Sequence, residues 1–205
     1  MLALAAAEPR LADFYLTGGT ALAAYYLGHR VSDDLDFFAF AEPDRQFLHA
    51  FANTIQREID AANARYERLH DRSMFFYQLP GGILKVEFAR YPFRQLEPPM
   101  ARPGIRVDSL RDIAANKLMA ILERFEPKDF VDLYFVLQQR ELDAIRKDAQ
   151  QKFGHAIGDL FLGGELAKIG RLSALPRMLK PLTTEELKSF FSEQARRLSS
   201  GVLEG

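Results

Sequence analysis

The first strong hydrophobic pattern in the chain is a short apolar run that ends at a pair of glycines. Residues 14–16 are aromatic and aliphatic, which suits a buried strand. At Gly18 and Gly19 the backbone is free to turn or to approach another group closely. Helix-compatible residues follow from Thr20, and Gly28 suits the end of that helix. Because the free N–H groups of a helix start attract anions, this turn is a candidate site for a triphosphate.

The next segment, residues 30–38, alternates in side-chain character with a period of two, which predicts a second strand. Asp33 has the opposite parity to the acids that follow it, so we do not expect it to join them. Oxygen ligands suit hard divalent cations, and paired metal ions stabilise both oxygens of a phosphoryl transfer. We therefore expect Asp34 and Asp36 to bind Mg²⁺ or Mn²⁺. The predicted strand has one face with Arg30, Ser32, Asp34 and Asp36 and another with Val31, Leu35 and Phe37.

A turn signal at residues 80–82, Pro-Gly-Gly, separates two alternating runs at residues 73–79 and 83–88. This arrangement predicts a β-hairpin. Lys85 and Glu87 lie on one face of its second strand. A polar, solvated strand face would explain this pair without any function, because half-buried strands commonly have one.

Helical periodicity dominates the rest of the chain. Apolar side chains recur at helical spacing between residues 110 and 125, with Lys117 beside the stripe and Arg124 two turns later. Pro127 suits the first turn of a following helix, in which Lys128 is spaced to pair with Asp132. Further helices are expected at residues 46–64, at residues 142–153, and from a capping box at residues 183–186 to about residue 198.

These patterns predict an α+β fold, with a small mixed β-sheet core flanked by helices and a mainly helical C-terminal part. A chain of 205 residues, 48% of them hydrophobic, is long enough to bury one core or two small lobes. A proline- and glycine-rich connector at residues 98–104 is the best boundary, and it gives domains 1–100 and 101–205. Loops are expected in the C-terminal third at Gly154, Gly158, Gly163, Gly164 and Gly170.

Composition excludes several classes of protein. There is no cysteine, which removes disulfides and thiol chemistry and is compatible with a cytoplasmic protein. No run approaches the roughly 18 apolar residues of a membrane span, and a net charge of −1 argues against broad coating of nucleic acid. We expect His29 to be solvated in a loop. A zinc site is not expected, since no ligand spacing connects His49, His70 and His155.

Four motifs spread over residues 14–137 resemble the AbiEii/AbiGii-type nucleotidyltransferase family within the DNA polymerase β-like superfamily. The fourteen residues between Gly19 and Asp34 exceed the usual spacing of the superfamily but suit this branch. The four motifs are Gly18-Gly19-Thr20-Ala21-Leu22, Arg30-x-Ser32-x-Asp34-x-Asp36, Asp112-Ile113-Ala114-Ala115-Asn116-Lys117 and Lys128-Asp129-Phe130-Val131-Asp132-Leu133-Tyr134.

The resemblance implies further site residues. The superfamily has a third carboxylate on a neighbouring strand, and Glu87 is the candidate, as metal ligand or as base for the acceptor hydroxyl. A functional lysine maps to Lys117. The alternative is a lysine without function that snorkels from a core boundary to solvent. One of Asp129 and Asp132 is implied to orient Lys117 or an arginine, and the sequence ranks the two acids equally.

Together these observations predict a metal-dependent nucleotidyltransferase. Gly18, Gly19 and Thr20 would hold the triphosphate of an NTP, and Arg30 and Ser32 are also expected to bind the nucleotide. Arg30 would hold a phosphate or neutralise the carboxylates of Asp34 and Asp36. The resemblance implies RNA or tRNA as acceptor, a cognate antitoxin as partner, and a role in a toxin–antitoxin or phage-defence system. Two alternatives stay open: a transferase for small molecules of the antibiotic type, and a catalytically silent module that binds nucleotide, RNA or an antitoxin.

Overall fold

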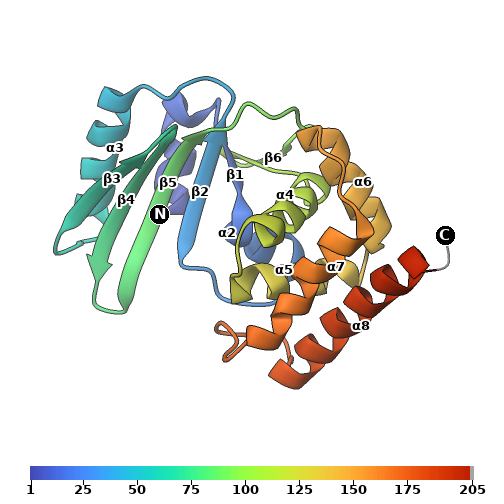
Figure 1. Cartoon of the computed structure of the whole chain (residues 1–205). Helices are drawn as coiled ribbons and strands as arrows, with labels where there is room; N and C mark the ends of the chain where they lie inside the picture. Colours follow the sequence, from blue (N-terminus) through green and yellow to red (C-terminus); the bar gives the residue numbers. More distant parts are fainter. Residues whose placement is uncertain (204–205) are drawn as a thin grey trace. The chain divides into compact units, whose positions relative to one another are not determined.

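The computed structural model describes residues 1–203, which fold into two compact units (Figure 1). Unit 1 comprises residues 1–21 and 32–109, and unit 2 comprises residues 22–31 and the chain from residue 110 onward. The backbone therefore passes from one unit to the other three times. The predicted functional domains, 1–100 and 101–205, stay a prediction.

Unit 1 is built on a mixed seven-stranded sheet with the strand order β3-β4-β5-β2-β1-β7-β6. Strand β2 lies at its centre, antiparallel to β1 and parallel to β5, while β3 and β6 form the edges. The strands are β1 Tyr15–Thr17, β2 Asp34–Ala39, β3 Ala64–Leu69, β4 Arg72–Leu79, β5 Gly82–Arg90, β6 Met100–Arg102 and β7 Ile105–Val107.

One face of this sheet is covered by helix α3, Arg45–Glu58 (Figure 1). The Tyr77 hydroxyl donates to the Ala52 carbonyl at 3.2 Å, which ties β4 to the helix. Phe88 of β5 is fully buried and packs its ring against Phe37 and Phe51, with centroids 5.4 and 6.2 Å apart. Unit 1 also contains α1, Leu2–Ala7, and the 3-10 turn η1, Pro9–Leu11.

Two elements of unit 1 differ from the sequence prediction. The helix expected at residues 46–64 ends at Glu58, because Asp60 takes a positive φ of 51° and the chain turns into β3. The connector expected at residues 98–104 contributes β6, which pairs with β7 in the sheet. The hairpin at Pro80-Gly81 and the period-two pattern of β2 are confirmed.

Unit 2 is helical. Its buried side chains include Ile113 and Leu118 of α4 and Phe191 of α8, and the Phe191 ring meets Phe130 of α5 edge-on at 5.2 Å. Helix α2 begins in unit 1, and its last residue, Leu22, belongs to unit 2. The helices are α2 Gly18–Leu22, the π-helix η2 Ala23–Leu27, α4 Leu110–Glu123, α5 Pro127–Leu137, α6 Leu142–Phe153, α7 Asp159–Ala167, the 3-10 turn η3 Lys168–Arg171 and α8 Thr184–Leu203.

Local signals located most of these helices correctly. Gly28 ends η2 with a φ of 57°, and Pro127 lies at the first position of α5. The capping box is formed, with the Glu186 backbone N–H donating to Thr183 Oγ1 and the Glu186 carboxylate accepting from Thr183.

The loop expected at Gly163 and Gly164 is wrong, because both residues lie inside α7. A Cβ atom at Gly163 would lie 3.3 Å from the Ala195 carbonyl oxygen, so the missing side chain allows α7 and α8 to approach closely. Here glycine serves helix packing rather than a turn.

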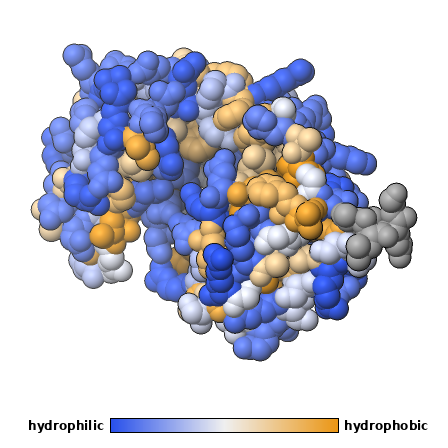
Figure 2. Space-filling view, in the orientation of Figure 1, coloured by the Kyte–Doolittle hydropathy of each residue, from blue (hydrophilic) through white to orange (hydrophobic). Residues whose placement is uncertain are grey.

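The visible face of the molecule is mostly hydrophilic, with smaller hydrophobic patches among the polar side chains (Figure 2). None of the helices within residues 1–203 combines the length and the apolar character needed to cross a membrane.

Candidate active site

In unit 1 the diglycine turn lies directly against the acids of β2. Thr17, the last residue of β1, pairs with Asp36 in the sheet register, so Gly18 follows at that level. Gly18 has a φ of +69°, and a Cβ atom on it would overlap the Asp36 carboxylate. The Thr20 hydroxyl donates to the backbone carbonyl of Asp34. A residue other than glycine at position 18 would push the carboxylate away, so glycine is needed for the close approach as well as for the turn.

Strand β2 directs both acids to the same face. Leu35, Phe37 and Ala39 are buried on the core side, whereas Asp34 and Asp36 lie partly exposed on the other side. The Asp36 side chain retains 19% of its surface, which leaves its oxygens accessible to a hydrated ion or a ligand. The structure thus brings together Gly18, Asp34 and Asp36 as the sequence pattern predicts.

Arg30 and Ser32 are not part of this strand, which begins only at Asp34. The expectation that the two residues share a strand face with the acids is wrong. Arg30 instead forms an isolated antiparallel bridge with Met178 within unit 2. Long-range pairing has ended the alternating pattern early. Their predicted role in nucleotide binding stays a prediction.

Glu87 of β5 lies beside Asp36 in the parallel register, and its side chain is fully buried. Arg72 donates to it through Nε at 2.5 Å and Nη2 at 2.8 Å, and Lys85 Nζ donates at 3.1 Å. Burial alone would raise the pKa of Glu87, but the Arg72 hydrogen bonds and the Lys85 charge hold it below its ordinary value. The alternative that Lys85 and Glu87 form a solvated pair without function therefore does not fit Glu87, because its side chain is buried.

Lys85 joins the two strands electrostatically. Its Nζ lies 3.4 Å from Asp36 Oδ1 and 3.1 Å from Glu87 Oε2. Burial acts to lower the pKa of Lys85, but the charges of Asp36, Glu87 and Asp34 raise it above its ordinary value. The lysine is accordingly a protonated cation between the acids of β2 and β5.

Asp108 is a buried acid at this end of the sheet that the sequence reasoning missed. Thr17 Oγ1 donates to Asp108 Oδ2 at 2.8 Å, and the Asp108 N–H donates to the Leu16 carbonyl at 2.9 Å. These bonds fix the end of β1 just before Gly18. The available signal was the acid directly after the short alternating segment Ile105-Arg106-Val107, ahead of α4.

Unit 2 holds a second group of charged residues around the segment 29–31. This segment is anchored by backbone hydrogen bonds, from the Leu179 N–H to the His29 carbonyl and from the Val31 N–H to the Arg177 carbonyl, each at 2.8 Å. It thereby joins the helical unit although it is 79 residues away from α4 in sequence.

Asp132 of α5 is the central acid of this group. It accepts from His29 Nε2 at 2.7 Å and from Arg30 Nε and Nη2 at 2.6 and 2.8 Å, and Lys117 Nζ lies 2.6 Å away. Burial opposes ionisation, but the Lys117 charge and the Arg30 and His29 hydrogen bonds hold the pKa of Asp132 far below its ordinary value. His29 is fully buried, so its expected solvation is wrong, and Asp132 is the physical reason.

Lys117 of α4 is buried between both acids of α5. Its Nζ donates to Asp129 Oδ1 at 2.8 Å, and Arg124 donates to Asp129 Oδ2 at 3.0 and 3.2 Å. Burial acts to lower the pKa of Lys117, but the Asp132 and Asp129 charges raise it above its ordinary value. The structure therefore groups Lys117, Asp129 and Asp132. Their roles in the reaction stay a prediction.

Comparison with known families shows to which family this chain belongs. The family model described as "Nucleotidyl transferase AbiEii toxin, Type IV TA system" matches residues 2–200. The chain belongs to this AbiEii family. Membership of this nucleotidyltransferase family is what the four motifs predict, and the predicted α+β nucleotidyltransferase fold is confirmed.

Relatives of known sequence or structure agree with the AbiEii fold. An uncharacterised protein from Aquifex aeolicus is 37% identical over 145 residues, which cover 69% of this chain and 66% of the relative, slightly under two thirds of its length. A putative nucleotidyltransferase from H. pylori has a TM-score of 0.61 at 18% identity, covering 99% of this chain and 93% of that one. MenT4, a nucleotidyltransferase toxin from Mycobacterium tuberculosis, has a TM-score of 0.52 at 17% identity, covering 96% and 83%.

Nucleotidyltransferases of the superfamily that contains AbiEii generally use divalent metal ions. The acids of β2 are suitable ligands for such an ion. Asp34 and Asp36 supply hard oxygen donors beside a turn that only a glycine fits. Within residues 1–203, however, no three His, Cys, Asp or Glu side chains are grouped to hold a metal. The oxygens of Glu87 face Arg72 and Lys85. Two protein carboxylates, completed by phosphate oxygens and water, match the usual Mg²⁺ environment.

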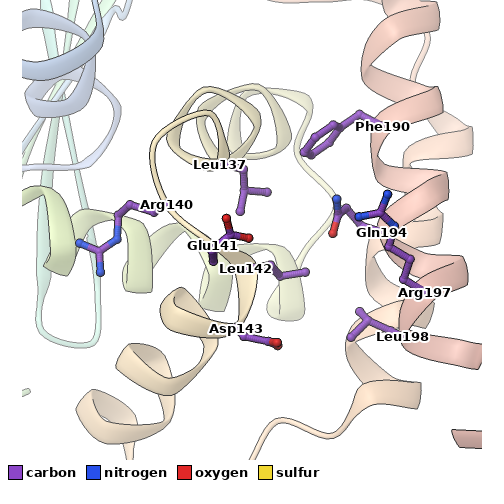
Figure 3. Close-up of a pocket in the computed structure, with 9 residues that line it drawn as sticks. All are labelled: Leu137, Arg140, Glu141, Leu142, Asp143, Phe190, Gln194, Arg197 and Leu198. Carbon is purple, nitrogen blue, oxygen red and sulfur yellow. The ribbon is translucent and has the colours of Figure 1, made fainter. Parts of the chain in front are cut away.

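A pocket of about 310 Å³ lies elsewhere, within unit 2 (Figure 3). Leu137 and Leu142 on one side and Phe190 and Gln194 of α8 on the other side project into it. None of its lining residues is a predicted site residue of this AbiEii chain.

We expect Gly18→Ala to reduce both stability and nucleotidyl transfer. A positive φ costs an alanine about 1–2 kcal/mol, and the added methyl group would displace the Asp36 carboxylate. Urea unfolding should show this loss, and transfer should fall by at least about tenfold if the metal ligand moves. Gly81→Ala is the matched control, because a Cβ atom there meets nothing within 4 Å. Equal behaviour of the two variants would contradict the proposed need for close approach.

Proposed function

We propose that this AbiEii protein transfers a nucleoside monophosphate from an NTP to an acceptor hydroxyl on RNA or tRNA. The observation that carries the proposal is the contact between Gly18 and Asp36, which puts a helix-start turn and two acids of one strand face side by side. Helix starts of this kind bind phosphate, and paired acids bind the metal that accompanies it. The family membership supports the same reaction class.

In the proposed reaction each group of the chain has a distinct task. Gly18, Gly19 and Thr20 hold the triphosphate through the turn and the start of α2. Asp34 and Asp36 hold Mg²⁺ or Mn²⁺, which would neutralise phosphate charge and orient the reacting oxygens. The acceptor hydroxyl gives up its proton to water and attacks the α-phosphorus, the bond from the α-phosphorus to the α–β bridging oxygen breaks, and pyrophosphate leaves. Most of the acceleration would come from positioning and electrostatics.

The remaining predicted residues belong to the proposal in the same way. Lys117, oriented by Asp129 and Asp132, is proposed to offset phosphate charge. The Lys117 contacts with both acids support an ordered, permanently charged lysine. Arg30 and Ser32 are proposed to assist nucleotide binding.

The biological setting follows from the family description. A Type IV toxin–antitoxin family implies an antitoxin partner and an NTP substrate. We propose that the chain acts as the toxin of such a pair in the cytoplasm, in defence against phage, with RNA or tRNA as its target.

A transfer assay tests the proposal. Each of the four NTPs, labelled on the α-phosphate, is incubated with the protein, Mg²⁺ or Mn²⁺, and either cellular RNA or a set of small hydroxylated acceptors. We expect label on RNA with the unmodified protein and none with Asp34→Ala, because the variant lacks one of two metal ligands. Label on small acceptors alone would favour an antibiotic-type transferase. Thermal stabilisation by metal-NTP without any transfer would favour the silent binding module.

A further inference from the structure

We infer that Lys85 is a positioning residue that occupies the metal-binding side of Asp36 until a divalent cation displaces it, and that Glu87 acts by holding Lys85 rather than as a third metal ligand. This inference rests on the proposed function, because it assumes that Asp36 binds metal. It assigns to β5 a task different from that of β2.

The sheet register places the two lysine contacts on neighbouring strands. Asp34 pairs with Lys85 and Asp36 with Glu87 in the parallel β2–β5 ladder, so side chains of the same parity face the same side. Lys85 Nζ lies between the acids, 3.4 Å from Asp36 Oδ1 and 3.1 Å from Glu87 Oε2. A unit positive charge therefore already lies where charge neutralisation of Asp36 is required.

The Glu87 carboxylate has more and shorter contacts with cationic side chains than the single contact between Asp36 and Lys85. Its side chain is fully buried, and Arg72 donates a bidentate pair of hydrogen bonds to it, from Nε to Oε1 at 2.5 Å and from Nη2 to Oε2 at 2.8 Å. Removing a buried carboxylate from such partners is costly, because the remaining charge is left without compensation. A metal that recruited Glu87 would have to break this pair.

The contact between Lys85 and Asp36 is the easier one to exchange. At 3.4 Å it is longer than the three contacts that Arg72 and Lys85 make with Glu87, at 2.5, 2.8 and 3.1 Å. The Lys85 and Asp36 side chains also keep 21% and 19% of their surface exposed. Solvent access weakens an ion pair and gives an arriving cation a route to the oxygen. When Lys85 releases Asp36 it retains Glu87, so its charge stays beside the phosphate-binding turn.

The charge balance is consistent with one exchange. Asp34, Asp36 and Glu87 carry three negative charges, and Arg72 and Lys85 carry two positive charges. Without Lys85, Asp36 would lose the attraction of the ammonium group at 3.4 Å, and the repulsion between the two acids of β2 would be less well compensated. Lys85 thus keeps the acids ionised and together, and it competes with the metal for Asp36.

The test measures Mn²⁺ binding to the full chain without nucleotide, by loss of the free-Mn²⁺ electron paramagnetic resonance signal. We expect Lys85→Gln to bind Mn²⁺ about three- to tenfold more tightly than the unmodified protein, because a competing charge is gone. Lys85→Arg, which keeps the charge, should stay closer to the unmodified protein. Lys147→Gln, an exposed lysine on α6, controls for the loss of any positive charge. Equal or weaker binding by Lys85→Gln would overturn the inference.

A double-mutant cycle tests the role of Glu87 separately. If Glu87 acts through Lys85, Glu87→Gln should weaken Mn²⁺ binding in the unmodified background but change it less than about twofold in the Lys85→Gln background. The same large loss in both backgrounds would identify Glu87 as a direct ligand and overturn this part. Circular dichroism verifies folding, and Lys85→Met, which keeps the aliphatic stem, replaces Lys85→Gln if the latter does not fold.

The outcomes separate this inference from the proposed function. If the unmodified protein and Asp36→Asn bind Mn²⁺ equally, or neither binds, the assumed metal site is wrong and both proposals fail. If Asp36→Asn loses binding while Lys85→Gln gains nothing, the metal site stands and only the role of Lys85 fails.

Discussion

We expect Asp36→Asn to abolish nucleotidyl transfer while leaving the fold in place. The carboxylate lies against Gly18 at the start of α2, and an amide oxygen there would lack the charge that holds a divalent cation. Metal and electrostatic stabilisation in phosphoryl transfer is worth several kcal/mol, so we expect the rate to fall by at least about 10³-fold. The measurement is the initial rate of label transfer from an α-labelled NTP at saturating metal.

A surface acid of the same sheet provides the control for Asp36→Asn. Asp71 lies between β3 and β4, 48% exposed, and pairs with Arg90 at 3.5 Å. Asp71→Asn removes the same charge without touching the turn, and we expect its transfer rate to stay within about twofold of the original, since exposed pairs contribute little. Full activity of Asp36→Asn, at an unchanged unfolding midpoint, would rule out the proposed metal site.

We expect Asp132→Asn to destabilise the protein strongly. The Asp132 carboxylate is fully buried and faces His29, Arg30 and Lys117 at 2.6–2.8 Å. Neutralising one partner of a buried ion cluster leaves the other charges uncompensated, which costs about 3–5 kcal/mol. Equilibrium urea unfolding at pH 7 measures this loss. Asp143→Asn on α6, 68% exposed, should cost less than about 1 kcal/mol.

The pH dependence gives a second readout of the same residue. The folded state lowers the pKa of Asp132, so its carboxylate contributes stability above the unfolded value of about 3.9 and loses it as the pH falls toward the folded pKa. The difference in unfolding free energy between the two proteins should therefore be full at pH 7 and shrink below about pH 4. A difference that stays constant down to pH 3 would contradict the assignment.

Local signals predicted the elements that carry the site. The period-two pattern placed Asp34 and Asp36 on one face of a strand, and Pro-Gly between two alternating runs located the β4–β5 hairpin. Pro127 and the capping box at Thr183 marked helix starts within one residue. In each case the deciding interaction is made by residues a few positions apart, so the sequence window contains it.

The errors concern interactions between distant segments. His29 was expected to be solvated because Asp132, its buried partner, lies 103 positions away. Asp108 is separated from Thr17 by 91 positions, and neither residue type indicates the other. Gly163 was predicted to lie in a loop because the α8 backbone that packs against it is about 30 residues away in sequence. The Arg72 partner of Glu87 was missed for the same reason, since it lies 15 positions earlier.

The course of the backbone between the two units also bears on how the protein is made. The segment 22–31 belongs to unit 2, but the backbone groups that hold His29 lie at Leu179 and Lys180, about 150 residues later. At a translation speed of about 5–20 residues per second, this early segment is synthesised roughly 8–30 s before its partners. Synthesis through residue 109 completes the residues of unit 1, whereas the Arg30 end of the motif can form its backbone contacts only after residues 177–180 have been added.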